Sequence, residues 1–284
     1  YKQKRYNSGL KTINELEAKY SPIKKPVRAI HLKVLILLAL KKFEQADDVL
    51  RRRISSQADL SLIRLRVEVL KHIKDPTRIL SVTGQGLGIS TSEDEGFLYF
   101  HRANALYDME KYQEADAYYN LAIKNPPEES ERLIRFRILK IQYLLGRFPE
   151  LLRNVEKFLK DNREDDYTNE ILLLVGNYFL EKNEKEKAAS YLNLLLVNYK
   201  KSVRQVELNP EKRMEQIFLI GKIYNGLNKF EMAERWLNQA LKSMDALKEG
   251  RKKWQLSILR EKGEVLFHLG KHRQALAASL KVLY

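Results

Sequence analysis

Stretches in which apolar residues recur every three or four positions alternate along the chain with short polar stretches. Such spacing gives each stretch one apolar stripe to bury, as in an amphipathic helix. Gly or Asn in the polar stretches can adopt the left-handed conformation that ends a helix. These stretches read Leu-Gly-Arg-Phe at 145–148, Leu-Asn-Lys-Phe at 227–230 and Leu-Gly-Lys-His at 269–272. The pattern therefore predicts antiparallel pairs of helices joined by tight turns.

Small residues recur at fixed places within this pattern. A Gly or Ala in a predicted first helix is followed three positions later by a large apolar residue and twelve positions later by an Ala. An interior Gly costs a helix about 1 kcal/mol relative to Ala, so we expect a neighbouring helix to come very close there. The recurrence predicts a stack of helix pairs. The small residues and their Ala partners are Ala103 with Ala115, Gly176 with Ala188, Gly221 with Ala233, and Gly263 with Ala275.

Residues 96–129 carry the clearest copy of the pattern, marked by Tyr99, Ala103, Leu106, Tyr112, Ala115, Tyr119, Ala122 and Pro127. This copy resembles the tetratricopeptide repeat, in which small and aromatic residues occupy these places in a helix pair. The resemblance extends over nearly the whole chain. Further copies lie at 214–247 and 256–284, and weaker ones at 27–60, 132–163 and 169–202. The 69 positions from Val34 to Ala103 leave room for a degenerate repeat at 61–95.

The resemblance implies an all-α fold, a right-handed α-solenoid of about seven antiparallel helix pairs that forms a single domain over 1–284. Two places depart from the pattern. Leu139 and Leu151 are bulkier than the small residues usual there, and we expect them to push the helices of 132–163 apart. Residues 82–92 contain Gly84, Gly86 and Gly88 without the spacing of a phosphate-binding loop. We expect them to form an irregular linker that interrupts the degenerate repeat and acts as a hinge.

The ends and the composition add a few limits. The chain begins without Met and stops inside the last predicted helix, so we expect it to be a fragment of a longer protein. The apolar run Val34–Leu40 is too short to span a membrane, which takes about 20 residues. The absence of Cys excludes disulfides and thiolate metal sites. It also fits a bacterial cytoplasmic or periplasmic protein without deciding between them.

The formal net charge of +15 permits binding to nucleic acid, to anionic lipid or to an acidic protein. The charged clusters are patchy and fall at predicted helix ends or between repeats, which is typical of solvated surface. A nucleic-acid-binding solenoid, with Lys and Arg aligned along its groove, remains the alternative. The basic clusters are Lys2–Arg5, Lys24–Arg28, Arg51–Arg53 and Lys248–Lys253, and the acidic ones are Glu93–Glu95 and Glu164–Asp166.

Signals for catalysis are weak. His268 and His272 are four positions apart, as metal ligands on one helix face would be, but the predicted turn at Leu269-Gly270 separates them. The carboxylates of Glu164–Asp166 have no apolar surroundings that would shift their pKa values. We therefore predict no enzyme, no catalytic or metal site and no cofactor. The chain as an interaction module of a larger enzyme is a further alternative.

In the tetratricopeptide-repeat family the first helices line a concave face that contacts peptides. Asn side chains there can bond an extended backbone, and aromatic rings can bury an anchor residue. The resemblance thus implies a protein partner, bound as a peptide or helix, and the basic side chains favour an acidic one. The implied contact residues are Phe97, Phe100, His101, Asn104, Tyr107, Phe136, Arg137, Lys140, Tyr143, Leu173, Asn177, Phe218, Lys222 and Asn225.

One well-known mode of the family is a clamp for a peptide's terminal carboxylate. This chain has Asn104 at one clamp position, but Phe100 stands where a Lys is needed and Arg137 where the next Asn is needed. We therefore expect a different ligand mode. The sequence predicts a non-catalytic protein–protein interaction scaffold within a bacterial multiprotein assembly, and it indicates neither the partner nor the oligomeric state.

Overall fold

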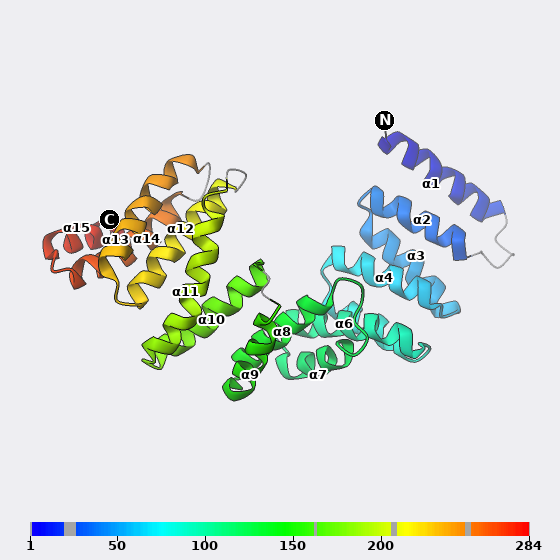
Figure 1. The fold of residues 1–284 in the computed structure, drawn as a ribbon. Helices are drawn as coiled ribbons and strands as arrows, with labels where there is room; N and C mark the ends of the chain where they lie inside the picture. Colours follow the sequence, from blue (N-terminus) through cyan, green and yellow to red (C-terminus); the bar gives the residue numbers. More distant parts are fainter. Residues whose placement is uncertain (1, 20–26, 162–163, 206–208, 248–250, 284) are drawn as a thin grey trace. The chain divides into compact units, whose positions relative to one another are not determined.

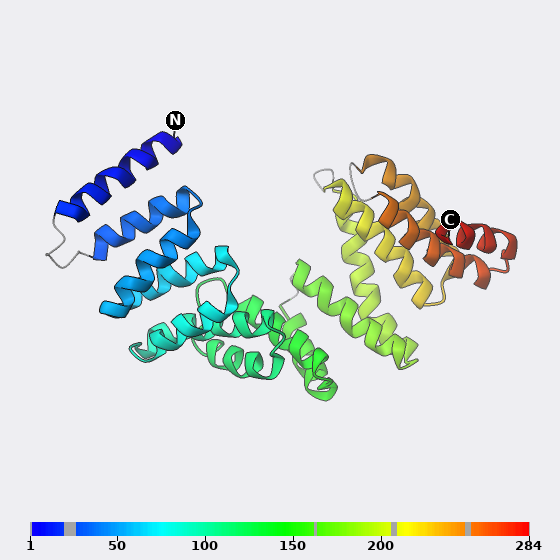
Figure 2. The ribbon, with the colours of Figure 1, turned by 180° about the vertical axis from the view of Figure 1, so that it is seen from behind.

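A computed structural model describes residues 2–19, 27–161, 164–205, 209–247 and 251–283. Over these residues the chain is helical, with fifteen α-helices, one short 3₁₀ helix and no β-strand (Figures 1 and 2). The predicted all-α fold of stacked helix pairs is confirmed.

The helices group into two compact units, Tyr1–Asn154 (unit 1) and Val155–Tyr284 (unit 2). The division falls within α9 (Phe148–Leu159). Unit 1 contains α1 (Lys2–Lys19), α2 (Val27–Ala39), α3 (Phe43–Ser56), α4 (Leu60–Ile73), α5 (Pro76–Leu87), α6 (Ser92–Asp108), α7 (Tyr112–Ala122) and α8 (Glu131–Leu144). Unit 2 contains α10 (Asp166–Glu181), α11 (Lys185–Ser202), α12 (Pro210–Gly226), α13 (Phe230–Ser243), η1 (Met244–Ala246), α14 (Arg251–His268) and α15 (His272–Leu283).

The single solenoid domain over 1–284 stays a prediction, and each compact unit is described by itself. Within each unit every helix packs on the next one in chain order, as expected when a repeat contacts only its neighbours.

A left-handed residue marks the turn in each of the seven helix pairs from α2/α3 to α14/α15. Gly146, Asn228 and Gly270 adopt this conformation as predicted. Each turn residue lies seven positions after the small or apolar residue that opens its pattern, so the turns fix the register of every pair. The full set is Lys41, Lys74, Glu110, Gly146, Asn183, Asn228 and Gly270, with φ between 56° and 73°.

The expected irregular linker at 82–92 is wrong. Helix α5 continues through Gly84 and Gly86 to Leu87, and α6 begins at Ser92. Gly86 is buried, and a Cβ added there would lie 2.8 Å from Leu98 Cδ2 and 3.1 Å from Ile63 Cγ2. The absence of a side chain at Gly86 therefore lets α5 pack closely against α4 and α6.

Interior glycines in unit 2 show the close approach that the sequence predicts. A Cβ added to Gly221 would lie 2.9 Å from the Leu237 side chain of α13, and one added to Gly176 would collide with Leu192 of α11. The small residues thus set the distance between the two helices of a pair.

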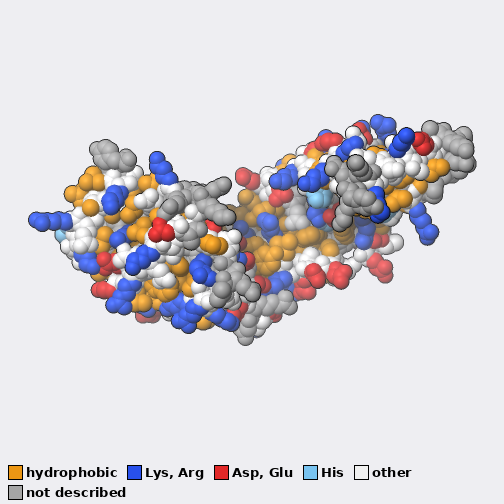
Figure 3. Space-filling model, turned by 90° about the horizontal axis from the view of Figure 1, so that it is seen from above, with side chains coloured by type: hydrophobic (Ala, Val, Ile, Leu, Met, Phe, Trp, Pro, Cys, Tyr) orange, Lys and Arg blue, Asp and Glu red, His pale blue; other side chains and the backbone are white. Residues whose placement is uncertain are grey.

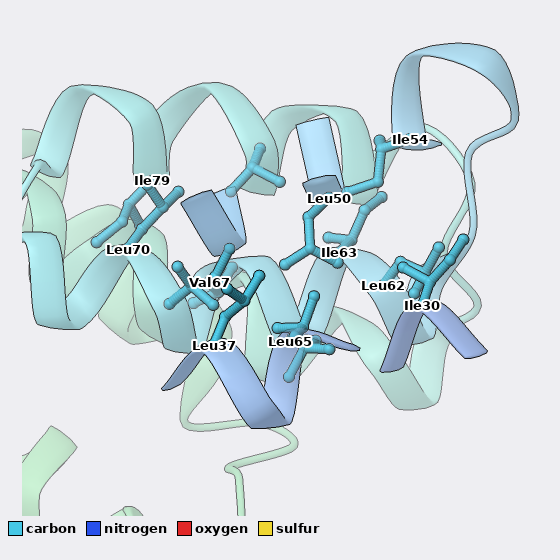
Figure 4. Packing of buried hydrophobic residues seen from close by; sticks show 14 of the residues in the cluster. Ile30, Leu37, Leu50, Ile54, Leu62, Ile63, Leu65, Val67, Leu70 and Ile79 are labelled. Carbon is cyan, nitrogen blue, oxygen red and sulfur yellow. The ribbon is translucent and has the colours of Figure 1, made fainter. Parts of the chain in front are cut away.

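One core cluster of unit 1 is a layer of aliphatic side chains mainly from α2, α3, α4 and α5 (Figure 4), and a second lies among α6, α7 and α8. Helix α4 contributes the largest share, and five of its apolar residues are labelled in the figure: Leu62, Ile63, Leu65, Val67 and Leu70. Helix α1, which the sequence did not predict, packs on α2 and places Leu10 against this core.

Candidate partner-binding face

The first helices α4, α6 and α8 of unit 1 are joined by side-chain contacts. The Arg64 guanidinium lies 4.8 Å from the Phe97 ring centroid, and His101 Nε2 lies 3.8 Å from Glu68 Oε1. The guanidinium of Arg137 lies 4.1 Å from the centroid of the Tyr107 ring. These contacts bring the three helices together into one surface. We call it the first-helix face and define it by Arg64, Glu68, Lys71, Phe97, Asn104, Tyr107, Arg137 and Lys140.

His101 lies beneath this face rather than on it. Its side chain is 6% exposed and lies between the rings of Phe97 and Phe100, with centroids 4.3 and 5.0 Å away. Burial, helped by the charge of Lys71 and opposed by that of Glu68, lowers the pKa of His101 to about 4. His101 is therefore neutral near pH 7, and its ring serves to pack α6 against α4.

Asn104 is held by a hydrogen bond from the second helix of its own repeat. The Tyr119 hydroxyl donates to Asn104 Oδ1 at 2.6 Å. Burial raises the pKa of Tyr119, so the hydroxyl keeps its proton and remains a donor. Asn104 itself is only partly buried. The carbonyl oxygen of Asn104 therefore points toward Tyr119, and its amino group remains able to donate to another acceptor.

Helix α8 contributes two cations that lie over aromatic rings. Arg137 covers the Tyr107 ring, which in turn meets Tyr112 edge-on at 5.4 Å. Lys140 Nζ lies 5.5 Å from the centroid of Phe136, a buried ring. Tyr143, one turn further on, contacts Phe148 edge-on at 5.9 Å.

In unit 2 the predicted residues lie on α10 and α12. Asn177 and Lys222 are exposed, and Leu173 is half-buried. Phe218 is buried and meets Trp254 edge-on at 5.9 Å. Asn225 is also buried, and its Nδ2 donates to Glu261 Oε1 at 2.9 Å. The last two residues thus join α12 to α14.

Five of the fourteen residues implied by the family resemblance are therefore buried: Phe100, His101, Phe136, Phe218 and Asn225. The other nine keep part of their surface exposed. The structure adds Arg64, Glu68 and Lys71 of α4, which the sequence did not single out because the degenerate repeat had no register. The pair Asp75-Pro76, a capping residue followed by a Pro at the start of a helix, is the sequence signal that would have fixed the register of this repeat.

Other features of the surface do not form a site. His268 stacks on Phe230 with centroids 4.6 Å apart, and His272 meets Phe267 edge-on. Over the described ranges no group of three His, Cys, Asp or Glu residues is placed to hold a metal ion. None of the helices in those ranges is both long and apolar enough to cross a membrane. Lys and Arg side chains are scattered among acidic and apolar ones on the face shown in Figure 3.

Comparison with known families matches residues 98–129 and 217–243 to the tetratricopeptide repeat. These segments cover the second part of α6 with α7, and most of α12 with α13. The chain contains tetratricopeptide repeats. These two helix pairs are among those with the clearest copies of the sequence pattern. A comparison with curated protein sequences finds no significant match.

Solved tetratricopeptide-repeat structures share the fold. The apo form of RapI superposes with a TM-score of 0.62 at 16% identity, over 88% of this chain and 73% of RapI. The C-terminal part of a TPR repeat-containing protein from Cytophaga hutchinsonii gives a TM-score of 0.62 at 12% identity, over 88% of this chain and 93% of that one. A chain of the APC/C hetero-tetramer Cut9–Hcn1 gives 0.52 at 11% identity, over 98% of this chain. This chain spans about half (49%) of that last protein. At these identities the likeness concerns the fold.

Proposed function

We propose that this tetratricopeptide-repeat chain is a non-catalytic scaffold whose first-helix face binds a peptide or helix of a partner protein. The observation that carries the proposal is the contact of α4, α6 and α8 through their exposed or half-buried side chains. Partly exposed aromatic rings (Phe97, Tyr107) alternate there with groups that donate hydrogen bonds (Asn104, Arg137). Aromatic anchors beside amide and guanidinium donors are the chemistry that recognises a protein segment.

The proposal extends to a place within a bacterial multiprotein assembly. A repeat stack offers a long surface built from many helices, which suits contact with several partner segments. In unit 1 the exposed or half-buried residues named by the resemblance, together with those of α4, make up the proposed contact surface. Leu173, Asn177 and Lys222 lie in unit 2 and are proposed as contact residues of that unit by itself.

The test uses substitutions that alter the surface and spare the packing. Asn104→Ala would leave the buried Tyr119 hydroxyl without its acceptor, which typically costs about 1–3 kcal/mol. Asn104→Asp keeps an oxygen acceptor and removes the amino group, so it is combined with Asn177→Ala. The matched control is Asn120→Ala with Asn193→Ala, because both residues are exposed and lie on second helices.

The chain and both double variants are used to capture partners from a nuclease-treated bacterial lysate at low and at moderate salt. We expect a discrete protein to be retained at moderate salt by the chain and by the control, and to be lost by Asn104→Asp/Asn177→Ala. Equal retention of the partner by that variant would show that the assigned residues do not bind it. Material that disappears with nuclease and with moderate salt would replace the proposal with nucleic-acid binding, whose affinity falls steeply with salt.

A further inference from the structure

The cations of the first-helix face in unit 1 differ in whether they already have a carboxylate. Arg64 Nη2 lies 2.5 Å from Asp94 Oδ1, and Lys71 Nζ lies 2.9 Å from Glu68 Oε2. Arg137 forms no ion pair within the described part of the chain, and its buried Nε has no hydrogen-bond partner there. An unpartnered guanidinium donor in a half-buried side chain is costly, because its lost hydration is not replaced.

Tyr107 holds this guanidinium in place. The ring lies 4.1 Å from the Arg137 guanidinium, and the ring itself is fixed by its edge contact with Tyr112. A guanidinium presents its donors in a planar fork that matches the two oxygens of a carboxylate, and an aromatic ring beneath it leaves that fork accessible at its edge. The exposed carboxylate of Asp108, next to Tyr107 in the chain, makes no ion pair with Arg137.

Asn104 adds a second donor one helical turn before Tyr107. Its Oδ1 accepts from the Tyr119 hydroxyl, so both N–H bonds of its Nδ2 remain for another acceptor. Arg137 is close enough to Tyr119 for its positive charge to oppose the rise in the pKa of Tyr119 that burial causes. Asn104, Tyr107, Tyr119 and Arg137 therefore form one cluster that offers the Nδ2 of Asn104 and the guanidinium of Arg137 as donors, with the Asp108 carboxylate near enough to act on Tyr119.

We infer that Arg137 and Asn104 together bind the carboxylate of an Asp or Glu side chain on the partner segment, with Tyr107 and Tyr119 positioning the two donors. This inference rests on the proposed protein-binding function and names the chemistry of its ligand. A fork of one guanidinium with one amide fits a planar carboxylate. The neighbouring Arg64 and Lys71 already have carboxylates, and Lys140 lies against the ring of Phe136, so the two donors of the cluster are better matched to a carboxylate than to a phosphate.

The experiment is selection from a displayed library of random 12-residue peptides, fused at their C-termini so that every carboxylate offered is a side chain. The baits are the whole chain, Arg137→Glu, Arg137→Gln and Arg135→Glu. Arg135 is the matched control, because it lies two positions away on α8, is exposed, and pairs with Glu131 at 2.7 Å instead of contacting Tyr107. Circular dichroism establishes that each variant keeps its helical content.

We expect the chain and Arg135→Glu to enrich peptides with Asp or Glu at one position beside apolar residues. Arg137→Glu should lose these peptides and enrich Lys or Arg at the same position. A selected acidic peptide, measured singly by fluorescence anisotropy, should bind Arg137→Gln about tenfold more weakly than the chain. Asn104→Asp, which keeps the acceptor for Tyr119, should weaken the same peptide through charge repulsion.

The outcomes separate the two proposals. If the chain enriches no peptide at all, the proposed function fails and the inference fails with it. If the chain enriches peptides without a preferred carboxylate, or if Arg137→Glu selects the same acidic peptides, the proposed function stands and the inference is overturned. Displacement of selected peptides by a 20-nucleotide poly-U RNA, with loss of RNA binding in Arg137→Glu, would assign the donors to phosphate and would also overturn it.

Discussion

His101 shows how burial changes the role of a single residue. Its ring contacts those of Phe97 and Phe100, and the charges of Lys71 and Glu68 act on it. The sequence alone placed it among the partner contacts, because the repeat register puts it on the first helix. The repeat register specifies the side of the helix on which a side chain lies. How closely the neighbouring helix packs determines whether that side chain is exposed to solvent.

The buried His101 predicts a loss of stability in acid. Its pKa is about 4 in the folded chain and about 6.5 when exposed, so between these values the unfolded chain binds a proton that the folded chain does not. Acid therefore favours unfolding, and this group should remove about 2 kcal/mol between pH 7.5 and pH 5. Urea unfolding at both pH values measures it. His101→Gln, which cannot titrate, should lose less stability than the natural chain. Equal losses would contradict the assignment.

At the scale of the elements, the glycines set how closely helices meet their neighbours. Gly96 lies in α6 against the turn after α7, and an added Cβ would collide with the Asn125 carbonyl. Asn125 cannot move freely, because its Nδ2 donates to the carbonyl oxygens of Ser92 and Glu93 at 3.3 and 3.1 Å. Gly84 differs, since a Cβ there would meet only Arg102 Nη1 at 3.5 Å, an ordinary contact.

This contrast predicts opposite effects of one methyl group. Gly96→Ala should destabilise unit 1 by about 1–3 kcal/mol, because the turn must shift. Gly84→Ala should stabilise it by up to about 1 kcal/mol, because Ala favours the helix and nothing has to move. Thermal unfolding followed by circular dichroism gives both values. A melting temperature for Gly96→Ala at or above that of the natural chain would show that α6 and the turn are not in such close contact.

The helix pairs followed from the sequence where small residues and turn residues agreed. The turns at Gly146, Asn228 and Gly270 were predicted because Gly and Asn tolerate the left-handed conformation. Lys74 and Glu110 adopt it too, but no residue preference announces a charged side chain there. The glycines of α5 were predicted to form a linker because Gly also favours turns. The sequence does not reveal that Gly86 lacks a side chain in order to let neighbouring helices pack closely. Helix α1 carries none of the repeat's small residues and was missed.

The candidate face was predictable only in part. Asn104, Tyr107 and Arg137 came from the repeat register, whereas the burial of Phe136 and Phe218 depends on which neighbouring side chains reach them. The contacts of Arg137 with Tyr107, and of Tyr119 with Asn104, cross between helices. Spacing along one helix cannot give such contacts. Arg64, Glu68 and Lys71 of α4 could be assigned to the face only from the structure, in which the left-handed Lys74 fixes the register of the degenerate repeat.

At the scale of the whole molecule, the chain has a net charge of +15, and its Lys and Arg side chains are dispersed over the face shown in Figure 3. Long-range attraction of this kind speeds the encounter with any acidic partner and weakens as salt is added. A specific face must therefore be recognised by contacts that persist at moderate salt. The aromatic rings of Phe97 and Tyr107 and the amide of Asn104, all on α6, meet this requirement.

The most direct measurement is hydroxyl-radical footprinting of the chain with and without its captured partner, because the oxidation of a side chain reports its exposure to solvent. Phe97 and Tyr107 represent the first-helix face, and Tyr118 and Leu121 of the second helix α7 are the internal controls. We expect the bound partner to lower the oxidation of Phe97 and Tyr107 and to leave that of Tyr118 and Leu121 unchanged. Protection of α7 with no change at Phe97 and Tyr107 would contradict it.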